Sequence, residues 1–371
     1  MTRLSEIEIP HYRVLDELGQ LCSKTNNDAL PDKAQLIDFY RGMLRTRLFD
    51  EKAIKLQRTG RLGTYASSLG QEAIGTALGA AMQTDDVLAP TYRDYAAQFS
   101  RGVSMSEILL YWGGDERGMD YQQARQDLPI CVPIASQATQ AVGIAYAMFY
   151  RQQPRVCVCV IGDGGTSKGE FYEAINAAGV WQLPLVFVIS NNQWAISLPR
   201  ERQSAANTLA QKAVAAGLPG EQVDGNDVIA CYERFSLAIE QARTGGGASV
   251  IEALSYRLSD HTTADDAARY RDTAELEKQW RYEPITRLKM FLQQQHQVCK
   301  AEFDDIRRLS QQEVEQQVQL YLDTPVAAAQ SMFDFLYQDL PAALQEQRLS
   351  VREAEVDDLQ QQSKARELGS G

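Results

Sequence analysis

The sequence predicts an α/β fold in which helices flank a parallel sheet, with helical extensions at both ends of the chain. Val156–Ile161 and Leu185–Ile189 are continuous apolar runs, and Ser249–Leu254 follows as a third strand pattern. Such runs are typical of strands buried on both faces of a sheet. Helical patterns separate them, which indicates parallel pairing through right-handed crossovers. After Thr273 the chain becomes polar and helical.

The first part of the chain predicts two helices and a short strand. Pro31 suits the first position of a helix, apolar residues follow at helical spacing, and Gly60 is expected to end it. Gly70–Met82 predicts a second helix, whose small residues allow close packing against a neighbour. Val87–Pro90 is expected to form a short strand.

The middle of the chain alternates helices with the buried strands. Gln137–Tyr150 predicts an Ala-rich helix, and the spacing of apolar residues predicts another around Phe171–Ala178. Cys157 and Cys159 alternate within one strand, so both should face the same side as small core residues.

Length sets the scale of the domain organisation. At about 150 residues per domain, 371 residues allow about two domains, or one large α/β domain with extensions. We expect an N-terminal helical arm over residues 1–65 and an α/β binding domain over residues 66–300. A C-terminal helical extension over residues 301–371 is expected to pack on the same domain.

Composition excludes several functions. The net charge of −12 argues against nucleic acid and anionic membrane surfaces as partners, and three histidines argue against a zinc site built on several of them. No apolar stretch is long enough to span a membrane, and residues 1–10 lack the apolar core of a signal peptide. The six cysteines form no C-x-x-C pair, so we expect a reducing, cytoplasmic location.

One segment carries the strongest functional signal. The strand Val156–Ile161 is followed by Gly162-Asp163-Gly164-Gly165, whose glycines permit a tight turn before a helix expected to start near Ser167. Open α/β sheets bind ligands at the carboxyl ends of their strands, and N–H groups at a helix start suit phosphate oxygens. Asp163 is an anion at the same place, so a divalent cation between it and a phosphate would account for both.

The next strand offers further ligands for such a cation. Leu185–Ile189 leads into Ser190-Asn191-Asn192, so neighbouring strands would bring the Asn192 amide oxygen and the Trp194 carbonyl close to Asp163. These are oxygen ligands of the kind that Mg²⁺ prefers. Taken singly, Gly-Asp-Gly reads as a turn and Asn-Asn as a strand-end cap. Their placement after two buried strands joined by one helix favours the metal and phosphate site.

The pair Gly162-Asp163-Gly164 and Asn191-Asn192, 26 residues apart, resembles the thiamine-diphosphate motif. The residues that follow each half resemble the alpha subunit of the decarboxylase component of 2-oxoacid dehydrogenase complexes, most of all the pyruvate-type subunit. Further matching pieces occur in the family's order between about residues 30 and 300. They are Gly70-Gln71-Glu72-Ala73, Pro90-Thr91-Tyr92-Arg93-Asp94, Gln140-Ala141-Val142-Gly143, Val223-Asp224-Gly225-Asn226-Asp227 and the segment 256–271.

The resemblance implies a divided active site. It implies that this subunit binds thiamine diphosphate and Mg²⁺, while a beta subunit in an α2β2 heterotetramer holds the aminopyrimidine and supplies the activating glutamate. The implied reaction is oxidative decarboxylation of pyruvate, with acyl transfer to the lipoyl group of an acyltransferase component. Branched-chain 2-oxoacids such as 2-oxoisovalerate, and acetoin, remain open as substrates because part of the pocket lies on the other subunit. A dinucleotide-binding protein is disfavoured because G-x-G-x-x-G and a P-loop are absent.

The resemblance also implies roles for single residues. Asp163, Asn192 and the Trp194 carbonyl match Mg²⁺ ligands. Arg93 matches a guanidinium that grips the phosphates, whereas Arg257 is open between the same role and a structural salt bridge. The cofactor-binding residues carried over from the family are Tyr92, Arg93, Ile134, Gly162, Asp163, Gly164, Gly165, Asn192, Trp194, Arg257 and His261.

His261 is the single catalytic candidate. It lies in the polar loop Asp260–Asp266, which resembles the family's loop over the cofactor, where a histidine assists acyl transfer to lipoamide. An imidazole with a pKa near neutrality can move a proton in such a step. Thr262 stands where some relatives carry a phosphorylated serine. Ser190 replaces the Arg or Gln often found before the asparagine pair, which leaves one accessory phosphate contact without a residue.

Overall fold

The computed structural model describes residues 8–22 and 30–354. Most of the segment 1–10, for which a signal peptide is not expected, lies outside the described residues. Internal contacts divide the chain into two compact units, Met1–Tyr321 and Leu322–Gly371. The first unit holds the sheet and all the predicted site residues. The boundaries expected at residues 65 and 300 stay predictions.

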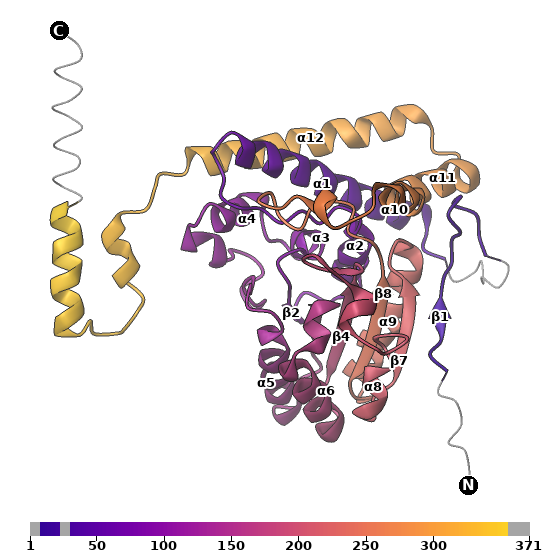
Figure 1. Cartoon of the computed structure of the whole chain (residues 1–371), viewed down its shortest axis with the longest axis horizontal. Coiled ribbons are helices and arrows are strands. Elements are labelled where there is room, and N and C mark those ends of the chain that lie inside the picture. The colour runs from indigo at the N-terminus through magenta and orange to yellow at the C-terminus, as the bar shows by residue number, and fades with distance from the viewer. Residues whose placement is uncertain (1–7, 23–29, 355–371) are drawn as a thin grey trace. The chain divides into compact units, whose positions relative to one another are not determined.

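The first unit is built on a six-stranded parallel sheet with the strand order β1-β7-β8-β4-β3-β2 (Figure 1). The strands of this sheet are β1 His11–Tyr12, β2 Val87–Ala89, β3 Cys157–Gly162, β4 Leu185–Asn191, β7 Gly220–Asp224 and β8 Ser249–Leu254. A short antiparallel pair, β5 Trp194–Ala195 and β6 Leu198–Pro199, follows β4. The predicted α/β class with a parallel sheet is confirmed.

Helices surround this sheet. They are α1 Lys33–Arg58, α2 Glu72–Ala81, α3 Tyr95–Ser100, α4 Met105–Trp112, α5 Ser136–Tyr150, α6 Gly169–Trp181, α7 Arg200–Gln203, α8 Lys212–Ala215, α9 Val228–Arg243, α10 Thr273–Gln279, α11 Pro284–His296 and α12 Lys300–Asp323. Within the described part of the chain, none of the helices is both long and apolar enough to cross a membrane.

Successive side chains of the central strands enter two different cores. On β3, Val158 and Val160 pack in the core shared with α1, α2 and α9, whereas Cys157 and Cys159 face the core formed with α5 and α6. Both cysteines are fully buried, which confirms their prediction as core residues. Helices on both faces explain why the strand sequences are continuously apolar.

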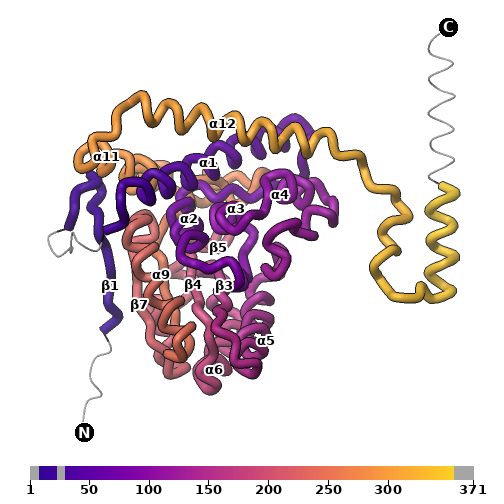
Figure 2. The backbone as a smooth tube through the Cα atoms, turned by 180° about the vertical axis from the view of Figure 1, so that it is seen from behind, coloured from indigo at the N-terminus to yellow at the C-terminus, as the bar shows by residue number. Residues whose placement is uncertain are grey.

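Helix α12 lies along α1, as the orange and indigo tubes of Figure 2 show. Lys52 pairs with Glu315 at 2.7 Å and Arg45 with Glu313 at 3.1 Å, while Val314 reaches the core. The N-terminus of α1 lies two residues later than Pro31 would place it. The reason is Asp32, whose side chain accepts a hydrogen bond from the Gln35 N–H at 2.8 Å and so caps the helix.

Strands β1 and β7 have no counterpart among the predicted elements. The sequence of β7 is polar, and Val223 is its single buried residue. Pairing with β8 on one side and β1 on the other gives it extended geometry. In the second unit, Ala329–Phe333 forms a 3-10 helix and residues 342–354 are helical, with Arg348 paired to Asp334 at 2.7 Å.

Candidate active site

The carboxyl ends of β3 and β4 lie next to each other. Their parallel register pairs Gly162 with Ser190, so Asp163 and the Asn191–Asn192 pair emerge from the sheet at the same edge. The sequence predicts this only on condition that the two strands are neighbours, and the structure confirms the condition. Because one helix connects these two adjacent parallel strands, the residues that follow them lie at the same edge of the sheet.

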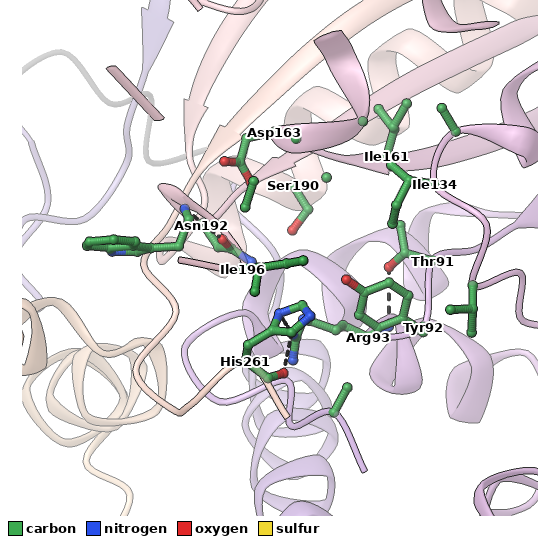
Figure 3. Close-up of a pocket in the computed structure, with 18 of the residues that line it drawn as sticks. Thr91, Tyr92, Arg93, Ile134, Ile161, Asp163, Ser190, Asn192, Ile196 and His261 are labelled. Atoms are coloured by element: carbon green, nitrogen blue, oxygen red, sulfur yellow. Dashed lines mark hydrogen bonds between the residues drawn. The ribbon is translucent and has the colours of Figure 1, made fainter. Parts of the chain in front are cut away.

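A cavity of about 540 Å³ opens at this edge. The predicted residues that line it are Tyr92, Arg93, Ile134, Gly162, Asp163, Gly164, Gly165, Asn192, Trp194 and His261. Figure 3 shows Asp163 and Asn192 from the strand ends on one side, and Tyr92 and His261 from separate loops across from them. Arg257 is the predicted site residue that does not line the cavity.

The turn after β3 is tighter than expected. Gly164–Ser167 forms a 3-10 helix, and α6 begins at Gly169 rather than near Ser167. Thr166 causes this difference, because its N–H and its Oγ1 both donate to the Asp163 carbonyl oxygen, at 3.2 and 2.8 Å. The turn needs its glycines, since a Cβ on Gly165 would lie 2.5 Å from Cγ1 of Ile161.

Asp163 is a buried carboxylate with an unused ligand atom. The residue is 2 % exposed, and its Oδ2 has no hydrogen-bond partner. Burial raises the pKa of Asp163 to about 6. A buried anionic oxygen without a partner is costly unless a cation or donor meets it. The described residues hold no cluster of three acidic, histidine or cysteine ligands, so a metal here would rely on one carboxylate with amide and carbonyl oxygens.

Gln71 organises the end of β4, although sequence reasoning gave it no role. Its Oε1 accepts hydrogen bonds from Ser190 Oγ at 2.9 Å and from Asn192 Nδ2 at 3.2 Å. The Asn192 Oδ1 accepts from the Trp194 N–H at 3.1 Å. The Ser190 hydroxyl, whose position often holds Arg or Gln in the family, is therefore hydrogen-bonded to Gln71. The only signal for Gln71 was its place in the Gly-Gln-Glu-Ala piece that matches the family.

Arg93 holds the His261 loop in addition to facing the cavity. Its guanidinium donates to the Ser67 carbonyl at 2.5 Å. It also donates to the His261 carbonyl at 2.6 Å and to His261 Nδ1 at 3.0 Å, two bonds that Figure 3 draws as dashed lines. A guanidinium has five N–H groups, so these three bonds leave two for a ligand. The predicted grip on a phosphate stays a prediction.

The His261 imidazole is uncharged at neutral pH. Burial, together with the positive charges of Arg93 and Arg257, lowers the pKa of His261 to about 4. The assumption of a near-neutral pKa does not hold for this structure, because two guanidinium groups face the ring. Since Arg93 can only donate, His261 Nδ1 is the acceptor and Nε2 carries the proton.

Arg257 lies behind this histidine and is fully buried. Its guanidinium donates to the Ile196 carbonyl and the Tyr270 hydroxyl, both at 2.8 Å, and lies 3.5 Å from His261 Nδ1. It forms no ion pair within 4 Å among the residues that the structure describes, so the expected salt bridge is not seen, and the grip on a phosphate stays a prediction. Arg257 instead ties the loop to the short hairpin after β4.

The chain is similar to a known protein family and to several named proteins. Residues 40–330 match the family described as the dehydrogenase E1 component. The chain is 39 % identical to the pyruvate dehydrogenase E1 component subunit alpha of Mycoplasma genitalium, over 91 % of this chain and 94 % of the relative. It is 36 % identical to the protein of that name from Staphylococcus aureus, over 92 % and 93 %. Identity with the protein of that name from Mycoplasma pneumoniae is 35 %, over 92 % and 95 %.

Proposed function

The chain belongs to the dehydrogenase E1 component family, and on that premise we propose that it serves as the alpha subunit of a pyruvate dehydrogenase. In this function it binds thiamine diphosphate and Mg²⁺, takes part in the oxidative decarboxylation of pyruvate, and supports acyl transfer to a lipoyl group. The family and the names of the relatives support the enzyme class and the presence of a beta subunit. Mg²⁺, the lipoyl-bearing acyltransferase and a cytoplasmic location belong to the proposal.

One observation carries the proposal. A buried carboxylate oxygen of Asp163, without a hydrogen-bond partner, faces a cavity that also receives Asn192 from the adjacent strand end. A chain with a net charge of −12 would repel a free diphosphate. A cation held by Asp163, Asn192 and the Trp194 carbonyl would remove that repulsion locally.

The residues of this chain bind, orient and exclude water. Thiamine diphosphate, when bound, supplies the nucleophilic carbon and the electron sink for decarboxylation. Gly164 and Gly165 line the cavity at the turn, and apolar residues such as Ile134 cover part of it. His261, uncharged and protonated on Nε2, can donate a hydrogen bond or a proton from that atom.

The decisive experiment uses the chain co-expressed with a beta subunit from the same organism. Bound thiamine diphosphate and Mg²⁺ are measured in the purified complex, and 2-oxoacid-dependent dye reduction is compared for pyruvate, 2-oxoisovalerate and acetoin. We expect one cofactor per alpha subunit and the largest kcat/KM with pyruvate. A preference for 2-oxoisovalerate or acetoin would contradict the substrate, and a complex that binds no thiamine diphosphate would contradict the function.

A further inference from the structure

Lys212 is a buried cation directly behind the turn that carries Asp163. The residue is 7 % exposed, and its Nζ donates to the Thr166 carbonyl at 2.7 Å and to Thr166 Oγ1 at 2.9 Å. The ammonium also lies 5.2 Å from the centre of the Tyr172 ring. No carboxylate lies within 4 Å of it in the described part of the chain. Burial and the nearby Arg200 lower the pKa of Lys212 to about 8, as expected for a cation without a close counter-ion.

Thr166 transmits the position of Lys212 to the site. Its side chain is fully buried, accepts from Lys212 and donates to the Asp163 carbonyl oxygen. The carbonyl that closes the turn and the carboxylate that faces the cavity therefore belong to the same residue. Moving the ammonium would move the hydroxyl, and with it the backbone from which the Asp163 side chain projects.

Glu252 holds the turn that leads into α8, the helix that begins at Lys212. One of its carboxylate oxygens accepts from the Leu209 N–H at 2.8 Å and the Ala210 N–H at 3.0 Å, just before Lys212. The other oxygen accepts from Asn191 Nδ2 at 2.7 Å. Glu252 is 1 % exposed on β8, the neighbour of β4. One carboxylate thus connects the strand end that carries the asparagine pair with the turn that leads into Lys212 at the start of α8.

We propose that Glu252, Lys212 and Thr166 form a buried brace that sets the position of Asp163 relative to the Asn191–Asn192 pair. The proposal rests on the proposed function, because the affinity that the brace controls is that for the cation and diphosphate. These three are positioning residues, since none of them lines the cavity. Groups that orient metal ligands commonly change metal affinity about 10- to 100-fold when they are removed.

The test compares Lys212→Met with Lys289→Met in the complex with the beta subunit. Lys289, on α11, is the matched control. Its ammonium lies 5.1 Å from the centre of the Phe303 ring, which resembles the contact of Lys212 with Tyr172. The readouts are the dissociation constant of thiamine diphosphate by calorimetry, the Mg²⁺ concentration for half-maximal binding, and the thermal midpoint without ligands. We expect Lys212→Met to weaken both affinities about 10- to 100-fold, and Lys289→Met to change neither more than about twofold.

Substitutions of Thr166 separate positioning from a general loss of structure. Thr166→Ser keeps the hydroxyl and should bind within about threefold of the wild type, whereas Thr166→Val should weaken binding about as much as Lys212→Met. The double variant should bind no more weakly than the worse single variant, because both changes break the same connection. Thr166→Val alone carries the test if Lys212→Met does not fold.

Two outcomes would overturn the brace. Unchanged affinities in Lys212→Met or Thr166→Val would show that the turn keeps its geometry without the brace, and fully additive losses would show that the two residues act separately. The wild-type complex distinguishes these failures from that of the proposed function. If it binds no thiamine diphosphate, the proposed function fails and the brace with it. If it binds and the variants bind equally well, the brace alone fails.

Discussion

At the scale of residues, the site shows two charges that the fold holds out of water. Asp163 is an anion, and one of its carboxylate oxygens has no hydrogen-bond partner. Arg93 is a cation that uses three of its five N–H groups in hydrogen bonds to His261 and Ser67. Residue types and spacing indicated Asp163 as a ligand contact, and the resemblance to the family implied the same for Arg93. The hydrogen bonds between Arg93 and His261 could not be read from the sequence, because 168 positions separate the two residues.

Asp163→Ala should abolish Mg²⁺-dependent binding of thiamine diphosphate, because none of the other described residues that line the cavity is a carboxylate. The same change should leave the thermal midpoint unchanged or raise it, since it removes a buried oxygen that has no partner. Calorimetric titration of the complex and a thermal scan measure the two effects. Normal cofactor affinity in this variant would contradict the metal assignment.

His261→Ala should preserve decarboxylation and lose transfer of the acyl group to lipoamide. The reason is that the Nε2–H of a neutral imidazole can serve a proton transfer in that step. Dye reduction reports the first half-reaction, and reduction of a free lipoyl domain reports the second. Equal losses in both half-reactions would instead indicate that His261 mainly shapes the cofactor site.

The lowered pKa of His261 also predicts a pH dependence of stability. Unfolded, the imidazole titrates near 6.5, and in the fold it titrates near 4, so the unfolded chain binds more protons between these values. Stability should therefore fall as the pH falls through this window. His261→Gln should lose less stability than the wild type between those pH values in thermal scans of the complex. Equal losses would show that His261 does not contribute.

At the scale of elements, the ends of β3 and β4 decide where the chemistry can occur. The apolar runs predicted both strands. The glycine and polar residues that follow them predicted a ligand site at their carboxyl ends. The polar strand β7 was missed because its geometry comes from its neighbours β1 and β8. Helix α6 starts later than expected because Thr166 bonds back to Asp163, a contact three residues away that composition does not reveal.

Gly165→Ala should damage the turn more than its small size suggests. The new Cβ would lie 2.5 Å from Cγ1 of Ile161, so the backbone must move away from β3. We expect a loss of about 1–3 kcal/mol in stability, from the magnitude typical of overpacked sites, together with weaker cofactor binding. Gly169→Ala is the matched control, because its Cβ would meet no atom within 4 Å. Similar effects of the two substitutions in thermal scans and calorimetry would refute this account of the turn.

At the scale of the whole molecule, the first unit holds one parallel sheet with one Gly-Asp-Gly and Asn-Asn edge. A net charge of −12 repels an anionic ligand except where positive charges are placed next to its binding site. The family and the names of the relatives imply a beta subunit, which agrees with the proposal that this chain supplies only the diphosphate half of the site.

The purified chain alone should therefore show no 2-oxoacid-dependent dye reduction, even with thiamine diphosphate and Mg²⁺ present. Activity should appear on mixing with the beta subunit, and should saturate at one alpha subunit for each beta subunit. A titration of one subunit against the other measures this. Turnover by the chain alone would contradict a divided active site.

The sequence by itself determined the fold class, the two central strands and the identity of the residues at their ends. These depend on local hydrophobic pattern and on glycine and polar residues next to one another in the chain. The tertiary structure alone decided that Arg93 contacts His261, that Gln71 holds Asn192, and that Lys212 lies behind Asp163. It also decided the lowered pKa of His261, because burial and neighbouring charges depend on segments that are distant in sequence and meet only in the fold.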